Sequence, residues 1–167
     1  DFEVDNFLQV PEPLIQKEFS RIMSLKDGSK KMSKSELSDL SRINLTDDKD
    51  LIINKIKKAK TDPLPLPSSV DELNERPEAK NLLGMYSSLT NSTLDKSVNE
   101  FEGKNFSEFK EKLSQVLVEK IKPISNEIKK LNEEEAYLDK ILLNGQKKAN
   151  NFASNKLKKM HEIIGFL

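Results

Sequence analysis

The sequence has 167 residues, enough for one ordinary domain or for part of one joined to another. Its 28 lysines and arginines balance its 28 aspartates and glutamates, so any contact with nucleic acid must come from local basic patches. The absence of cysteine excludes disulfides, thiolate catalysis and cysteine-ligated zinc, and the single histidine, His161, excludes zinc sites built from histidine pairs. Charged residues make up 34% of the sequence, which suits helices with narrow apolar stripes and wide charged faces.

No apolar run approaches the ~20 residues needed to cross a bilayer, so we expect no membrane association. The first ten residues, DFEVDNFLQV, are acidic and lack an initiator methionine, which argues against a signal peptide. They indicate a sequence taken from a longer one. The missing cysteines fit a reducing compartment, and we expect a cytoplasmic location.

Residues 1–29 are expected to be extended. Apolar residues alternate roughly with polar ones from Phe2 to Val10, and Pro11 and Pro13 forbid a helix there. The segment RIMSL, Arg21–Leu25, has the length of a strand and leads to an Asp-Gly turn. Two short strands do not make a stable sheet, so we expect them to complete a sheet whose other strands are absent.

The remainder of the sequence predicts helices. Thr46 is a good N-cap for a first helix, with two aspartates directly after it and apolar residues at helical spacing as far as Ala59. Thr61–Ser69, TDPLPLPSS, contains three prolines and is expected to be a stiff linker. Pro77 is expected in the first turn of a second helix, which its apolar spacing extends to Leu89.

Three breaks in the helical pattern divide the C-terminal part, at Asn91–Thr93, at Gly103 and at Asn144–Gly145. Asn91–Thr93 is expected to start a short helix that ends before Gly103, and a long helix then follows, with a kink at Pro123. Two further helices, at 133–143 and 147–164, are expected on either side of Asn144 and Gly145. The predicted fold class is therefore mainly α, with a helical bundle in the last hundred residues.

One stretch has the composition of a phosphate-binding loop. Ser29–Ser35, SKKMSKS, contains three lysines and three serines around Met32. Lysine ammoniums bind phosphate as point charges, and serine hydroxyls and loop amides add neutral donors. The sequence lacks the glycine spacing of a P-loop. From these residues alone, the stretch is either a solvated charge cluster after a turn or a mobile loop that binds phosphate.

The residues around this stretch resemble a known family. Lys31–Ser35, KMSKS, matches letter for letter the signature of class I aminoacyl-tRNA synthetases, and it follows RIMSL by the interval found in tryptophanyl-tRNA synthetases. Four further segments resemble the same family in the same order: VPEPLI (10–15), AKNLLGMYSSLT (79–90), EFEGKNFSEFKEKLSQVLVEKIKPI (100–124) and ANNFASNKLKKMHEIIGF (149–166). Together these segments resemble the C-terminal portion of the bacterial and organellar enzymes.

The resemblance implies two parts. Residues 1–45 would be the C-terminal remnant of a Rossmann-type catalytic domain, with two small strands and the KMSKS loop (Lys31–Ser35). Residues 46–167 would be a helical domain that binds tRNA and its anticodon. The family's His-Ile-Gly-His motif cannot be present because the one histidine is His161, so we expect the N-terminal half, with most of the tryptophan pocket, to be missing. Such a fragment should be inactive alone.

The resemblance also implies an ATP site. Lys31 and Lys34 would be catalytic, neutralising pyrophosphate as ATP reacts with tryptophan to form tryptophanyl-adenylate, and tRNA(Trp) would then accept the amino acid. Mg²⁺ would come with ATP and be held by phosphates, so no metal-ligating side chains are expected. Backbone groups of Ile22 and Met23 would lie against adenine. The expected ATP-binding residues are Ile22, Met23, Lys31, Met32, Ser33, Lys34 and Ser35.

Two alternatives remain open: a non-catalytic RNA-binding or scaffolding protein derived from a synthetase, and a tyrosine-specific relative. The resemblance implies a homodimer for the full-length enzyme.

The few aromatic residues are expected to be buried, so stacking on bases is not indicated. The lysine-rich faces are expected to be either solvated surface or contacts to tRNA phosphates; they comprise Lys147, Lys148, Lys156, Lys158 and Lys159, and separately Lys55, Lys57 and Lys58.

Overall fold

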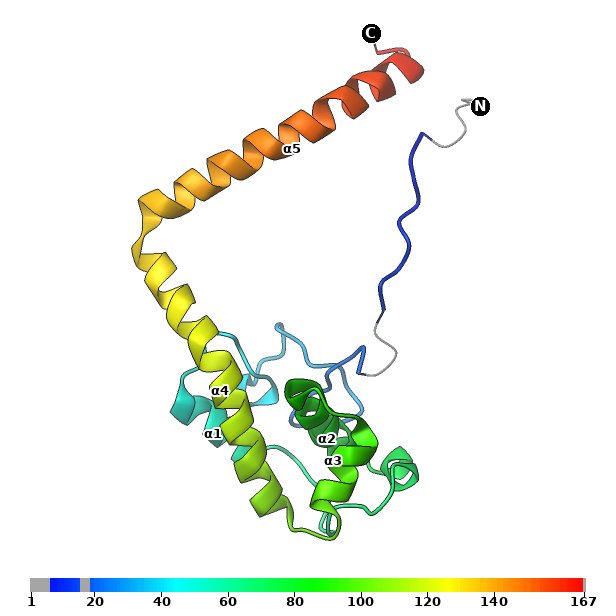
Figure 1. Cartoon of the computed structure of the whole chain (residues 1–167), viewed down its shortest axis with the longest axis vertical. Coiled ribbons are helices and arrows are strands. Elements are labelled where there is room, and N and C mark those ends of the chain that lie inside the picture. The colour runs from blue at the N-terminus through cyan, green and yellow to red at the C-terminus, as the bar shows by residue number, and fades with distance from the viewer. Residues whose placement is uncertain (1–6, 16–18, 167) are drawn as a thin grey trace. The chain divides into compact units, whose positions relative to one another are not determined.

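The computed structural model describes residues 7–15 and 19–166, and this part of the chain is mainly α-helical, as predicted (Figure 1). The helices are α1 (Lys49–Lys57), α2 (Pro77–Thr90), α3 (Leu94–Phe101), α4 (Phe106–Glu133) and α5 (Glu135–Ile163), with two short 3-10 helices, η1 (Asp39–Ser41) and η2 (Asp71–Glu75). None of the described helices is long and apolar enough to span a membrane.

The chain divides into two units. Residues 15–128 form the larger unit, which contains the KMSKS loop, α1 to α3 and most of α4. Residues 1–14 and 129–167 form the smaller unit, which contains α5. The boundary between residues 45 and 46 that the resemblance implies stays a prediction.

The predicted pair of strands is not found in residues 7–15 and 19–166. RIMSL instead makes a single antiparallel bridge with the start of the KMSKS loop, between Met23 and Lys31. The Ser24 amide donates to the Lys30 carbonyl at 2.7 Å, and the Met32 amide donates to the Ile22 carbonyl at 3.0 Å. The turn between the two segments brings them together, so RIMSL pairs locally. The earlier part of the expected alternation, with Phe2, lies outside the described residues.

Local signals place the ends of α2 and α3 as predicted. Pro77 lies in the first turn of α2. The hydroxyl of Thr93 accepts a hydrogen bond from the Lys96 amide at 3.4 Å and caps α3. Gly103 has a φ of +67° just after that helix, in the left-handed region that glycine adopts without strain.

Two helix boundaries differ from the predictions. α1 is capped by Asp48, whose carboxylate accepts from the Leu51 amide at 2.8 Å, and Thr46 does not cap it. Aspartate caps helices at least as well as threonine, and the later cap leaves Asp47 free to make other bonds. α5 continues through Gly145 without the expected break. One glycine costs a helix only about 1 kcal/mol, and good helix formers on both sides offset that cost.

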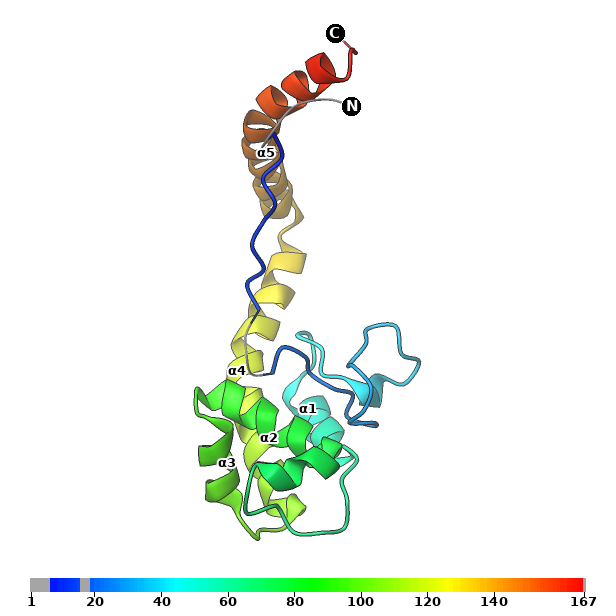
Figure 2. The ribbon, with the colours of Figure 1, turned by 90° about the vertical axis from the view of Figure 1, so that its right-hand side faces the viewer.

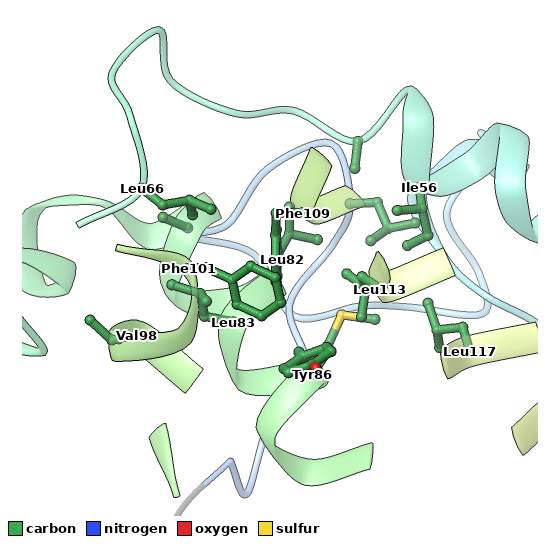
Figure 3. Close-up of a cluster of buried hydrophobic side chains, with 14 of the residues drawn as sticks. Ile56, Leu66, Leu82, Leu83, Tyr86, Val98, Phe101, Phe109, Leu113 and Leu117 are labelled. Atoms are coloured by element: carbon green, nitrogen blue, oxygen red, sulfur yellow. The ribbon is translucent and has the colours of Figure 1, made fainter. Parts of the chain in front are cut away.

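The core of the larger unit lies where α2, α3 and α4 meet (Figure 3). α2 and α3 lie side by side in both ribbon views (Figures 1 and 2). The rings of Tyr86, Phe101 and Phe109 meet edge to face, with centroids 5.0 Å apart for Tyr86 and Phe101 and 4.8 Å apart for Phe101 and Phe109. Such pairs add to the stability that burial already supplies. Phe109, on α4, is completely buried at the centre of this cluster.

Three aromatic side chains in the smaller unit are exposed, contrary to the prediction. Phe152 is 87% exposed, Phe166 is 75% exposed and Tyr137 is 50% exposed. All three lie on α5 or directly after it, and no residue of α5 is buried. The three rings are therefore exposed together with the rest of this helix.

Gly28 allows the segment before the KMSKS loop to lie against the first turn of α2. A Cβ at this position would lie 2.6 Å from the backbone carbon of Pro77 and 2.6 Å from the backbone nitrogen of Glu78. Leu25, three residues earlier, is buried, and its carbonyl accepts from the Lys60 amide at 2.7 Å. These contacts fix the N-terminal side of the loop to the helical core.

Replacing Phe109 with alanine should lower the free energy of unfolding of the larger unit by about 3–5 kcal/mol, because the change leaves a cavity between three helices. Urea denaturation followed by circular dichroism measures the loss. Phe152→Ala removes the same side chain from an exposed position and should leave the transition unchanged. Equal effects of the two substitutions would contradict the placement of the core.

Gly28→Ala should destabilise the larger unit by about 1–3 kcal/mol, because the added methyl group meets backbone atoms that cannot rotate away. Denaturation midpoints measure this effect. The matched control is Gly145→Ala, where an added Cβ meets no atom within 4 Å. That variant should raise the helix content of α5, since alanine favours a helix by about 1 kcal/mol over glycine. An unchanged midpoint for Gly28→Ala would refute the close approach to α2.

Candidate functional site

The KMSKS loop presents two lysines without partners. Lys31 and Lys34 are both exposed, and neither forms an ion pair with any residue that the structure describes. The hydroxyls of Ser33 and Ser35 lie 3.0 Å apart, and the Ser35 amide donates to the Ser33 hydroxyl at 3.3 Å. The serines thus close the turn on which Lys34 sits, while the two ammoniums stay available to a ligand.

Met32 has the opposite environment. Its side chain is half-buried and packs against the hydrophobic core, and its amide donates to the Ile22 carbonyl. The methionine therefore holds the middle of the loop on the protein. Lys31 on one side and Lys34 on the other remain in solvent. This alternation explains why a short charged loop contains one apolar residue.

The neighbouring lysine, Lys30, is paired. Its ammonium lies 3.1 Å from the Asp27 carboxylate. The Ser29 hydroxyl donates to the same carboxylate at 2.6 Å, and this hydrogen bond, followed by the one from Lys30, lowers the pKa of Asp27 to about 2. Asp27 is therefore ionised at neutral pH and closes the turn before the loop. The three lysines of the run are thus not equivalent.

The Met23 backbone is held by a side chain from α2. The Asn81 side-chain oxygen accepts from the Met23 amide at 2.8 Å, and its amide nitrogen donates to the Met23 carbonyl at 2.8 Å. Both backbone groups of Met23 are therefore occupied, and the Ile22 carbonyl is engaged by the loop. The expected contact of Ile22 and Met23 with adenine stays a prediction. Within the described residues, the Ile22 amide is the backbone donor left for it.

Lys55 is not a surface lysine, contrary to the prediction. Its side chain is fully buried, and its ammonium lies 2.6 Å from Asp47 and 2.7 Å from Asp39. It therefore cannot contact a tRNA phosphate. The signal was present in the sequence, since Lys55 follows Ile52 by three residues and precedes Ala59 by four, which puts it on the apolar stripe. Lys57, the last residue of the same helix, and Lys58, directly after it, are exposed, as expected.

The other lysine-rich face lies on α5. From Lys140 to Lys159 the sequence contains six lysines and no acidic residue, and all six are exposed. Lys156 contacts the ring and the carbonyl of Phe7 within the smaller unit. The remaining five are Lys140, Lys147, Lys148, Lys158 and Lys159.

The donor set of the KMSKS loop suits phosphate oxygens. Ammonium, hydroxyl and amide groups all donate hydrogen bonds, whereas a bound metal ion needs acceptor ligands. Within the described ranges, no three histidine, aspartate or glutamate side chains are placed to hold a metal ion. A groove of about 930 Å³ between α1 and α4 contains no residue of the KMSKS loop.

Comparison with known proteins gives several matches. The family model for class I tRNA synthetases (W and Y) matches residues 2–126. The tryptophan–tRNA ligase of Mesorhizobium japonicum is 49% identical over 164 residues, which are 98% of this chain and 46% of that enzyme. The enzyme of Rickettsia felis is 48% identical over 160 residues, which are 96% of this chain and 48% of that enzyme. The chain thus spans about half the length of these relatives.

Solved structures agree in fold. Tryptophanyl-tRNA synthetase from Mycoplasma pneumoniae matches 90% of this chain and 46% of its own, with a TM-score of 0.72 and 24% identity. The Campylobacter jejuni enzyme, solved with ADP and tryptophan, matches 98% of this chain and 49% of its own, with a TM-score of 0.66 and 23% identity. Because the family model covers most of the sequence, the chain belongs to the class I tRNA synthetases of the tryptophan and tyrosine group.

Proposed function

We propose that this chain is the part of a tryptophan–tRNA ligase that supplies the ATP-phosphate loop and the helical tRNA-binding region. The whole enzyme would join tryptophan to ATP, release pyrophosphate and transfer the amino acid to tRNA(Trp). One observation carries the proposal: Lys31 and Lys34 are exposed and have no acidic partner among the described residues, and the half-buried Met32 lies between them. The relatives from Mesorhizobium japonicum and Rickettsia felis are tryptophan–tRNA ligases, which favours tryptophan over tyrosine as the amino-acid substrate.

The chemistry matches a loop without a general base. A carboxylate nucleophile is already ionised at neutral pH, so activation depends on positioning and on charge stabilisation at the leaving group. Lys31 and Lys34 would place two positive charges against the oxygens of the departing pyrophosphate. Neither lysine has to break an ion pair with a described residue first. Mg²⁺ bound with ATP would add charge neutralisation on the phosphates.

Ser33, Ser35 and Met32 would act on the loop and less on the nucleotide. The two serines hold the turn through their hydroxyls, and their amides and hydroxyls can reorient toward phosphate when it arrives. Met32 would keep the loop on the core during this change. Most of the tryptophan pocket would belong to the part of the relatives that this chain does not match.

We further propose that α5 contributes to tRNA binding. Lys140, Lys147 and Lys158 are separated by seven and eleven residues, close to two and three turns of an α-helix, and therefore form one stripe. Lys148 and Lys159 follow two of these lysines by one residue and lie about 100° further around the helix. A stripe of this kind neutralises several backbone phosphates without reading bases. The family resemblance also supports a homodimeric full-length enzyme and a cytoplasmic location.

Lys34→Ala should lower the rate constant of tryptophan-dependent ATP–pyrophosphate exchange by about 10²-fold while changing the KM for ATP little, because the lost charge acts mainly on the transition state. The measurement uses the Mesorhizobium japonicum enzyme with its matching segment replaced by this chain. Lys30→Ala is the matched control, since this lysine is one residue from the loop and paired with Asp27.

The unmodified graft must catalyse the exchange with tryptophan and not with tyrosine. A graft that folds but is inactive would refute the proposed function, and tyrosine dependence would refute the amino-acid assignment. If Lys34→Ala raises the KM for ATP without lowering kcat, the lysine binds the ground state and has no special role in the transition state.

Replacing Lys147 and Lys158 with glutamine should weaken binding of tRNA(Trp) to the same graft and lower the slope of log affinity against log salt concentration by about 1–2, one unit for each lost phosphate contact. The control replaces Lys96 and Lys112, exposed lysines of α3 and α4. Filter binding at several salt concentrations measures the affinity and the slope for both variants. Equal losses in the two variants would rule out a specific role for α5.

A further inference from the structure

Lys55 of α1 is the most deeply buried charged group among the described residues. Its side chain has 0% exposure, and its ammonium lies 2.6 Å from the Asp47 carboxylate and 2.7 Å from the Asp39 carboxylate. A buried ammonium is stable only when it is paired and hydrogen-bonded. The two carboxylates and the Lys55 ammonium therefore hold one another in place.

The two carboxylates come from different places in the chain. Asp47 is buried just before α1, whereas Asp39 begins η1, four residues after the KMSKS loop, and its side chain is 47% exposed. The Asn44 side-chain amide joins them, donating to Asp39 at 3.0 Å and to Asp47 at 3.1 Å. Lys55 thus links α1 to the segment that follows the loop.

Arg42 extends this link back to the loop. Its guanidinium lies 3.0 Å from the Asp39 carboxylate and donates to the Glu36 carbonyl at 2.9 Å. Glu36 is the first residue after Ser35. A continuous series of contacts therefore runs from Lys55 through Asp39 and Arg42 to the end of the KMSKS loop. We call residues 36–42 the exit segment of the loop.

The entrance and exit of the loop are also joined to each other. The Leu25 amide donates to the carbonyl of Ser41 at 2.8 Å, and Ser41 is fully buried within the exit segment. The entrance is held independently by Asn81 and by the contact of Gly28 with α2. The charged pair at the entrance, Lys30 with Asp27, lies at the surface, whereas the charged pairs of the exit reach the buried Lys55.

We propose that Lys55 is a positioning residue for the KMSKS loop, holding its exit segment through Asp39 and Arg42 so that Lys31 and Lys34 meet phosphate from a fixed base. The part of this inference that concerns phosphate rests on the proposed function. The restraint on the exit segment does not, and it is measurable on the chain alone.

Asp39→Ala is the sharpest test, because it cuts the link to the loop and leaves the buried pair of Lys55 and Asp47 intact. Amide hydrogen exchange should become about tenfold faster or more at Ser41 and Leu25, while amides in α2 keep their rates. Asp50→Ala removes the same charge from an exposed position on α1 and should change neither. Unchanged exchange at Ser41 in the Asp39 variant would overturn the proposal, whatever the enzyme does.

A second readout tests the catalytic consequence. In the grafted enzyme, Asp39→Ala should lower kcat for ATP–pyrophosphate exchange by about tenfold with little change in the KM for ATP, because a displaced loop still binds but no longer meets the transition state well. Faster amide hydrogen exchange at Ser41 together with a wild-type kcat would refute the positioning role. Inactivity of the unmodified graft would refute the proposed function and the phosphate part of this inference, and would leave the restraint on the exit segment to the exchange result.

Asp39→Asn separates charge from shape. It keeps an acceptor oxygen at the same place but loses the ionic attraction to Lys55, so its amide exchange and its kcat should fall between those of the wild type and the alanine variant. Wild-type behaviour in both measurements would show that the ion pair is not what holds the exit segment, and the proposal would fail.

Discussion

Leu82 and Tyr86 of α2 fill the core against α3 and α4 (Figure 3). Asn81 of the same helix holds the Met23 backbone. Gly28 also lies against the first turn of α2, in a contact that leaves no room for a side chain. The packing of this one helix therefore supports both the hydrophobic core and the entrance of the KMSKS loop. Because a well-packed core resists small displacements, the loop begins from a defined position.

The lysines near the site divide by what surrounds them. Lys55 is buried and paired with two carboxylates, and Lys30 is exposed and paired with one. Lys31 and Lys34 have no acidic partner among the described residues. In a chain whose charges balance overall, positive potential for a ligand arises where lysines are left unpaired. The acidic residues around the loop stabilise its two ends and leave its centre positively charged.

The mainly α class was predictable, because helical spacing of apolar residues is a strong signal over ten residues or more. The prediction of two strands was wrong, since RIMSL has the composition of a strand but, within the described residues, pairs with the start of the KMSKS loop alone. The break expected at Gly145 was wrong because a turn signal of two residues is weak against long helical stretches on both sides. The KMSKS residues themselves were identified by resemblance, and composition alone left them ambiguous.

The sequence by itself determined the local features: the proline at the start of α2, the threonine cap of α3, the glycine after it and the lysines of the KMSKS loop. Each depends on residues a few positions away, so a short stretch contains the whole cause. Only the tertiary structure decided that Asn81 holds Met23, 58 residues earlier, and that the buried Lys55 ammonium meets both Asp39 and Asp47. These outcomes depend on which helix faces pack together, and that is settled by the burial of the whole core.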